Sequence, residues 1–164
     1  MSIPSSADTI SQPPPAPTGY TLHDGYPSVP SYLHLRSASG LTPKTTAQAR
    51  AALSGSWYGC YITTNDDDST PVAMGRIIGD GGWYFHIADM AVLPEHQRRG
   101  LGDAVLKRLL WKIKVEVPWE EGKGEERRAS AYVTLFADEA GRKLYVKNGF
   151  VEAAPKQMGM VMLV

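Results

Sequence analysis

Residues 83–110, WYFHIADMAVLPEHQRRGLGDAVLKRLL, determine the fold of this chain. The apolar run that ends at Val92 predicts a buried strand, and Pro94 ends it because proline donates no ladder hydrogen bond. Gly100 and Gly102 then allow a turn with bare amides, and apolar residues at helical spacing follow it. The first N–H groups of a helix have no partner and lie at the positive end of its dipole. The unit is therefore suited to hold a phosphate group.

The turn lacks two common phosphate-binding signatures. No Gly-Lys-Ser/Thr follows it, which excludes a Walker loop, and no Gly-x-Gly-x-x-Gly completes a dinucleotide fingerprint. Residues 97–102, Gln-Arg-Arg-Gly-Leu-Gly, follow Val-Leu-Pro and match the spacing Gln/Arg-x-x-Gly-x-Gly/Ala. This spacing resembles motif A of the GCN5-related N-acetyltransferase (GNAT) superfamily, in which the turn holds the pyrophosphate of acetyl-CoA. The resemblance extends over residues 55–164.

The resemblance implies an α/β fold with a mixed, mostly antiparallel central sheet of six to seven strands, flanked by about four helices. The sequence pattern predicts strands at residues 19–24, 57–63, 72–78, 83–92, 130–136 and 158–164. It predicts helices at residues 29–38, 42–52 (with Thr42 as N-cap and Pro43 in the first position), 100–114, and between Asp138 and Gly149. Residues 1–17 hold five of the twelve prolines and are predicted to be a disordered arm, which leaves residues 18–164 as a single domain.

The composition excludes several function classes. Seventeen basic and seventeen acidic residues cancel, so no overall field attracts nucleic acid or an anionic membrane. No apolar run is long enough to span a bilayer, and the first residues lack the basic region and apolar core of a signal peptide, so a cytoplasmic protein is expected. Cys60 is expected to be a buried, reduced thiol. The four histidines and this cysteine lack metal-ligand spacing, so no metal site is predicted.

The resemblance implies acetyl-CoA as the acetyl donor. The end of the predicted strand would pair with the amide groups of the pantetheine arm, and a free N–H between Met90 and Val92 would hold the thioester oxygen. Asp138 stands where the family has Asn. The residues implied to bind acetyl-CoA are Met90, Ala91, Val92, Gln97, Arg98, Arg99, Gly100, Leu101, Gly102, Asp103 and Asp138.

The stretch from Asp138 to Phe150 resembles the helix of the family that carries a tyrosine before Gly-Phe. On that match Tyr145 is the general acid that protonates the departing thiolate. A phenol with a pKa near 10 stays protonated at neutral pH and is able to donate. The alternative is that Tyr145 only packs in the core.

Two residues of the long strand are candidates for the base that accepts the amine proton. His86 lies six residues before Val92, where relatives in the superfamily carry Glu or His, and an imidazole suits proton transfer near neutral pH. The alternative is a core histidine without a catalytic role. Asp89 is the second candidate, although on a regular strand it would face away from His86 unless a bulge separated them.

These residues predict an N-acetyltransferase that acts on a small primary amine. Two alternatives stay open: an acetyltransferase for amino groups of peptides or proteins, and a module that binds acetyl-CoA without turnover. The apolar strand expected at residues 158–164 suggests a possible homodimer.

Overall fold

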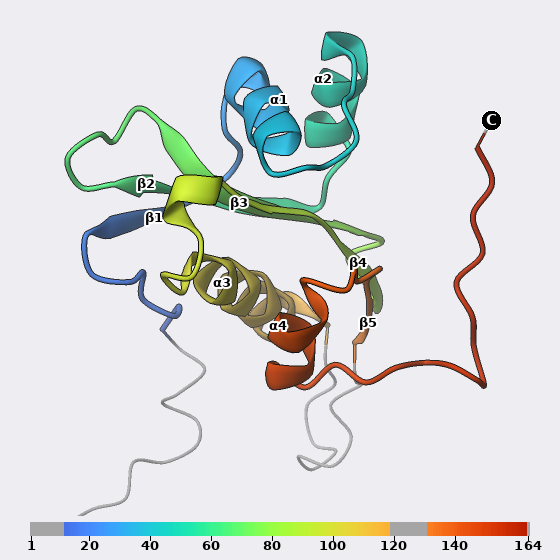
Figure 1. Ribbon diagram of the computed structural model, residues 1–164. Helices are drawn as coiled ribbons and strands as arrows, with labels where there is room; N and C mark the ends of the chain where they lie inside the picture. Colours follow the sequence, from blue (N-terminus) through green and yellow to red (C-terminus); the bar gives the residue numbers. More distant parts are fainter. Residues whose placement is uncertain (1–11, 119–130, 164) are drawn as a thin grey trace, which may run out of the picture.

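The computed structural model describes residues 12–118 and 131–163. Within them, one sheet of five strands runs in the order β1-β2-β3-β4-β5 (Figure 1). The strands are β1 (Tyr20–Asp24), β2 (Tyr58–Thr64), β3 (Pro71–Gly79), β4 (Tyr84–Val92) and β5 (Tyr132–Thr134). Strands β1 to β4 are antiparallel, and β5 is parallel to β4. The mixed, mostly antiparallel α/β sheet is confirmed, but the expected six to seven strands are wrong, since the described residues form five.

In the part of the chain that the structure describes, four helices flank the sheet, as predicted. Helices α1 (Val29–Ala38) and α2 (Thr46–Ser54) cover one face, and α3 (Leu101–Glu116) and α4 (Arg142–Lys147) cover the other (Figure 1). A short 3-10 turn, η1 (Pro94–His96), joins β4 to α3. The two faces of the sheet are called here the α1 face and the α3 face.

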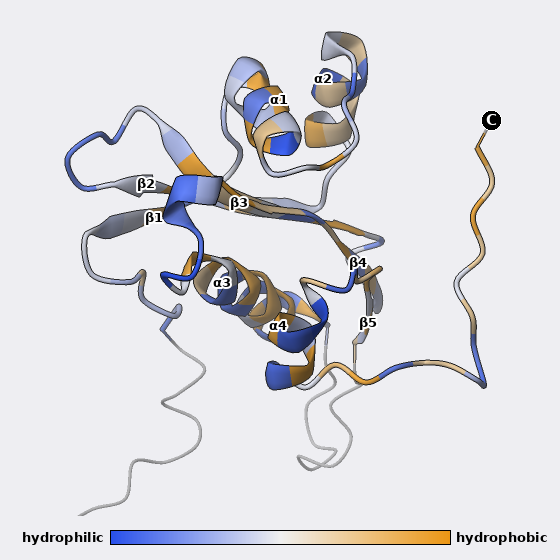
Figure 2. Ribbon diagram, viewed as in Figure 1, coloured by the Kyte–Doolittle hydropathy of each residue, from blue (hydrophilic) through white to orange (hydrophobic). Residues whose placement is uncertain are grey.

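The main core lies between the sheet and α3. This helix buries one side, which Figure 2 shows as apolar segments along the ribbon. Its buried apolar residues are Leu101, Ala104, Val105, Leu106, Leu109 and Ile113. They pack with fully buried residues of the sheet such as Ile77 and Phe85. Cys60 is also buried there, and burial raises the pKa of its thiol to about 12, as expected for an inert side chain.

Helix α2 begins later than predicted. Thr45, not Thr42, is the N-cap, because Thr45 and Gln48 form a reciprocal capping box that satisfies two backbone N–H groups. The carbonyl oxygen of Thr42 instead accepts hydrogen bonds from the Arg36 guanidinium. Two possible caps lay three residues apart, and the capping box favours the second of them.

The C-terminal part differs most from the prediction. Helix α4 begins at Arg142 rather than next to Asp138, and β5 is shorter than the predicted residues 130–136. Residues 158–163 form no strand, and the large apolar side chains among them are exposed (Figure 1). An apolar pattern shows that a segment is able to form a strand, but a strand also needs an edge to pair with. The predicted final strand is therefore wrong for the described residues.

Some predictions fall on other parts of the chain. Residues 1–11 of the expected arm, residue 130 of the strand expected at residues 130–136 and residue 164 of the expected final strand lie outside the described residues. Residues 12–17 are described, and the carbonyl oxygen of Pro17 accepts a hydrogen bond from the Tyr20 N–H at the start of β1. None of the helices in residues 12–118 and 131–163 combines the length and the apolar character that a bilayer span requires.

Candidate active site

Strand β5 pairs with only the first part of β4. The two strands pair from Tyr84 to His86 of β4, which leaves the rest of that β4 edge open within the described residues. The N–H of Leu93 donates to the carbonyl oxygen of Val72 on β3 at 2.9 Å. Because successive residues of a strand direct their N–H and C=O groups to opposite sides, those of Val92 point to the open edge. The side-chain amide of Gln97 donates to the Val92 carbonyl at 3.2 Å. The open edge therefore includes Val92, within the range where a free N–H was expected.

A β-bulge interrupts β4 at this edge. Met74 of β3 pairs with Ala91 and Arg76 pairs with Ala88, so two β4 residues, Asp89 and Met90, lie opposite Gly75 alone. Asp89 takes a left-handed backbone conformation, with φ at +53°. The extra residue changes the alternation of side chains between the two faces.

The bulge brings the two candidate bases to the same face. His86 pairs with Ile78, which is two residues from Arg76 on β3 and so shares its face. The Arg76 guanidinium contacts the Asp89 carboxylate, which places Asp89 on that same α1 face. A regular strand would have placed Asp89 on the α3 face.

Gly75 gives the bulge its room on the α3 face. A Cβ at this position would lie 2.7 Å from Met90 Sδ and from Val105 Cγ1. We expect Gly75→Ala to lower the free energy of unfolding by about 1–3 kcal/mol, because overpacking forces these side chains apart. Urea unfolding measures the change, with Gly82→Ala as a control whose Cβ meets only ordinary contacts. Equal stability of the two variants would contradict the packing of Met90 against Gly75.

The turn before α3 presents free backbone donors. Arg98 and Gly100 both have positive φ angles, +59° and +81°, and Gly100 is the N-cap. The first hydrogen bond of the helix runs from the Ala104 N–H to the Gly100 carbonyl at 3.0 Å, so the N–H groups of residues 101–103 have no partner inside the helix. Gly102 lies between β4 and α4, since a Cβ there would be 3.8 Å from Val92 and 3.4 Å from Leu144. The predicted phosphate turn therefore has the geometry that an anion needs.

Tyr20 and His96 contact each other beside this turn, and the sequence did not predict this contact. The Tyr20 hydroxyl lies 3.0 Å from His96 Nδ1, and Arg99 Nη1 donates to the same hydroxyl at 3.2 Å. Tyr20 belongs to β1, 76 residues before His96. No local pattern indicates such a contact, because it depends on the folded sheet.

The side chain of Asp103 is engaged between helices. Its carboxylate contacts Lys107 at 2.7 Å, Asn148 at 2.9 Å and Lys147 at 3.2 Å. Burial alone would raise the pKa of Asp103, but these three partners lower it to about 2. The side chain thus joins α3 to the end of α4, and only its backbone N–H is directed as the phosphate prediction needs.

His86 is half-buried beside β5. Its Nδ1 lies 2.9 Å from Thr134 Oγ1, and its ring centroid lies 5.3 Å from that of Phe136. Burial, and secondarily the positive charge of Arg76, lowers the pKa of His86 below its ordinary value. The imidazole is neutral at pH 7 and is able to accept a proton. Across residues 12–118 and 131–163, no three His, Cys, Asp or Glu side chains are grouped to hold a metal ion.

Tyr145 lies on α4 beside the turn that starts this helix. Its ring contacts Phe150 at a centroid distance of 6.0 Å, and its hydroxyl makes no hydrogen bond within the described part of the chain. Burial, and secondarily the Asp138 carboxylate, raises the pKa of Tyr145, so the hydroxyl stays protonated. Asp138 Oδ1 accepts a hydrogen bond from the Gly141 N–H at 2.6 Å, so that carboxylate oxygen is engaged in the local turn before α4.

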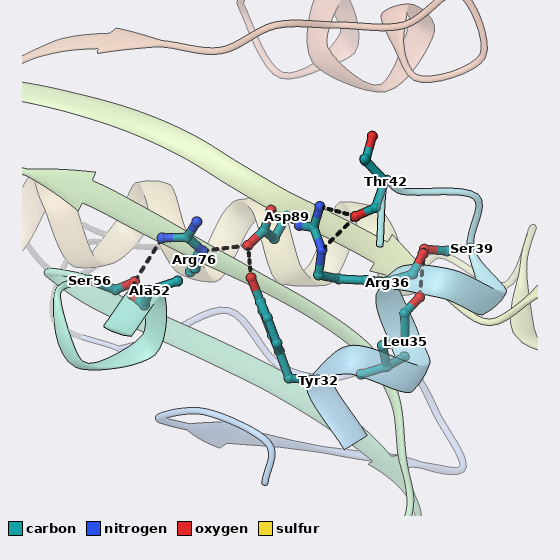
Figure 3. Close-up of polar contacts among 9 residues, drawn as sticks. All are labelled: Tyr32, Leu35, Arg36, Ser39, Thr42, Ala52, Ser56, Arg76 and Asp89. Atoms are coloured by element: carbon teal, nitrogen blue, oxygen red, sulfur yellow. Dashed lines mark hydrogen bonds and ion pairs between the residues drawn. The ribbon is translucent and has the colours of Figure 1, made fainter. Parts of the chain in front are cut away.

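The environment of Asp89 differs from that of a general base. Its carboxylate accepts hydrogen bonds from Tyr32, Arg36 and Arg76, and Figure 3 shows these side chains converging on it. Burial would raise the pKa of Asp89, but the Tyr32 and Arg76 hydrogen bonds and both arginine charges lower it below its ordinary value. A carboxylate so well stabilised in its charged form is a weak proton acceptor.

Comparisons with known proteins agree with this geometry. The acetyltransferase (GNAT) domain profile matches residues 56–152, more than half of the chain. A probable acetyltransferase from methicillin-resistant Staphylococcus aureus has 31% identity and a TM-score of 0.76, over 88% of this chain and 99% of its own. Comparison with curated protein sequences gave no significant match.

Two more distant structures share the fold. A GNAT-family acetyltransferase from Streptococcus pneumoniae has 23% identity and a TM-score of 0.67, over 88% of this chain and 98% of its own. The ribosomal-protein-S18-alanine N-acetyltransferase of Escherichia coli has 20% identity and a TM-score of 0.61, over 82% of this chain and 79% of its own. The matched domain profile and the similarity to the staphylococcal protein decide the family, and the chain belongs to the GNAT acetyltransferases.

Proposed function

We propose that this protein is an N-acetyltransferase that transfers an acetyl group from acetyl-CoA directly to a small primary amine. One observation carries the proposal. Strand β4 holds His86 and an open, bulged edge, and it leads directly into a turn whose amides are free to bind an anion. The groups proposed to bind the donor and to accept the proton thus lie on β4 or directly after it.

The residues present fit acetyl-CoA as donor. The free amides at the start of α3 and the guanidinium of Arg99 suit the negative pyrophosphate. The open edge of β4 at Met90 to Val92 suits the amide-bearing pantetheine arm, which is able to pair with it like an added strand. A backbone N–H of that edge would stabilise the thioester oxygen as negative charge develops on it.

The transfer moves two protons. The amine nitrogen attacks the thioester carbon, which forms the C–N bond, and His86 accepts the amine proton directly or through water. The C–S bond then breaks, and the Tyr145 hydroxyl donates its proton to the thiolate. The lowered pKa of His86 and the raised pKa of Tyr145 support these roles, since each group is in the required form at neutral pH.

The α1 face supports a small acceptor. Tyr32 and Arg36 are buried over the Asp89 end of β4, so this part of the face is already filled. The part around His86 is more accessible, because the neighbouring Ile78 and Phe136 are exposed. A compact amine fits this limited space better than a long peptide, which would need more of the face.

An acceptor panel tests the function. We would measure release of free CoA thiol and the mass of the acetylated product with alkylamines, amino sugars, amino acids and peptides. We expect acceptor-dependent release with one of the small amines. Turnover with peptides alone would favour the peptide acetyltransferase, and acetyl-CoA binding without release in any reaction would favour the non-catalytic module.

We expect Gly100→Ala to weaken acetyl-CoA binding about tenfold or more. Gly100 has φ at +81°, where a Cβ costs about 1–2 kcal/mol, so the turn relaxes and its amides lose their common direction. Calorimetric titration of acetyl-CoA measures the loss. Gly40→Ala is the matched control, since Gly40 has φ at +85° in a turn away from the site. An equal affinity of Gly100→Ala and wild type would contradict the phosphate assignment.

A further inference from the structure

We infer that Asp89 is a positioning residue: its carboxylate, held by Arg36, Arg76 and Tyr32, fixes the β4 bulge that aims the backbone N–H at the thioester oxygen. The inference rests on the proposed function, because it concerns how the same site is held in place. It assigns Asp89 a task other than proton transfer. It also gives a task to two arginines that the reaction does not otherwise use.

The carboxylate lies at the meeting point of three elements. Arg36 and Tyr32 belong to α1, Arg76 belongs to β3, and Asp89 belongs to β4 (Figure 3). All three donors bind the one carboxylate. The side chains of Arg36, Asp89 and Arg76 are only 8%, 11% and 13% exposed, so solvent screens their attraction weakly.

The arginines are themselves oriented by further contacts. Arg36 donates through Nη2 to the Thr42 carbonyl at 2.7 Å, and Arg76 donates through Nη1 to Ser56 Oγ at 3.0 Å. Neither guanidinium is free to follow Asp89 if β4 shifts. The network therefore fixes the position of Asp89 relative to α1 and β3.

The backbone conformation of Asp89 needs such support. A non-glycine residue at φ +53° is uncommon, although Asp tolerates the left-handed region better than most residues. Without the bulge, regular alternation would turn Asp89 to the α3 face, where Val105 and Leu109 are fully buried. Burying an unpaired carboxylate there is unfavourable, so the charge of Asp89 determines which register β4 adopts.

The register in turn decides which peptide groups face the open edge. Asp89 and Met90 are the two bulged residues, and the edge from Met90 to Val92 follows them directly. A slip of one residue reverses the direction of each N–H in a strand. The network is thus placed to keep a donor directed at the thioester oxygen, and it does so without touching the substrate.

Two analogues separate this role from a general loss of structure. One is a ketone analogue of acetyl-CoA with CH2 in place of sulfur, and the other is S-ethyl-CoA, which has the same length but no carbonyl oxygen. We expect wild type to bind the ketone about fivefold more tightly, as one hydrogen bond allows. We expect Asp89→Asn to lose this preference while its affinity for S-ethyl-CoA stays within about threefold of wild type.

Two further variants complete the test. Asp24→Asn is the matched control, because Asp24 is also held by a tyrosine and an arginine, Tyr58 and Arg108, and it lies on β1. We expect it to keep the full preference. Arg76→Lys retains the charge but is unable to reach both Asp89 and Ser56, so we expect a partial loss. It also replaces Asp89→Asn as the test if that variant does not fold.

The outcomes are distinct. An unchanged ketone preference in folded Asp89→Asn and Arg76→Lys would overturn the inference, as would equal loss of affinity for both analogues. Wild type that binds both analogues equally would overturn it as well, while the proposed function would survive. Wild type that binds neither analogue would overturn the proposed function, and this inference with it.

Discussion

Tyr145→Phe is expected to lower kcat about a hundredfold or more while the affinity for acetyl-CoA changes less than about twofold. The substitution removes only the hydroxyl, and this hydroxyl is protonated at neutral pH because burial and Asp138 raise its pKa. Without it the thiolate leaves unprotonated. Each hundredfold loss of kcat corresponds to a rise of about 2.7 kcal/mol in the activation free energy. Steady-state kinetics and calorimetric titration with acetyl-CoA measure the two quantities.

The control for this variant is Tyr61→Phe. Tyr61 lies on β2 and stacks on His23, an interaction that a phenylalanine ring preserves. We expect wild-type kcat for this variant. An unchanged kcat in Tyr145→Phe across the pH range would show that Tyr145 only packs in the core and that another group protonates the thiolate.

His86→Gln is expected to lower kcat/KM about a hundredfold near pH 7 and to remove the acidic limb of its pH profile. The pKa of His86 is lowered below 6.5, so the imidazole is neutral and basic above that pKa. In wild type, activity falls as the pH falls through this pKa, because protonated His86 accepts no proton. Glutamine is able to keep the contact with Thr134 but does not titrate in this range.

The pH profile of kcat/KM, measured with one acceptor from pH 5 to 9, distinguishes this role. His34→Gln, an exposed substitution on α1, is the control and keeps the limb. An acidic limb that persists in His86→Gln would assign it to another group and leave His86 as a structural residue.

The part of the site that could be predicted from sequence is the part that local chemistry determines. The apolar run before Val92, Pro94 and the glycines at 100 and 102 are neighbours in the chain, and each acts through backbone geometry alone. Strand β4, the turn and α3 therefore formed where expected. The face on which Asp89 lies could be predicted only on the condition that a bulge was present, because the bulge depends on pairing with β3.

Other features depend on contacts that the sequence does not display. Arg36 and Arg76 meet Asp89 only after α1, β3 and β4 have packed, across 53 and 13 residues. Tyr20 reaches His96 in the same way. The final strand was predicted wrongly for a related reason, since a strand also needs an edge to pair with. The start of α2 was predicted wrongly for a different reason: the Thr45–Gln48 capping box is a local signal, but Pro43 favoured Thr42 as the cap.

A crystal structure with acetyl-CoA would show where this chain holds its donor. We expect the pyrophosphate within hydrogen-bond distance of the amides of residues 101–103, and the thioester oxygen on an N–H between Met90 and Val92. We also expect the sulfur to lie close to the Tyr145 hydroxyl. Acetyl-CoA bound away from the turn before α3, or with its thioester oxygen away from the open edge of β4, would show that strand β4 and its turn are not the donor site.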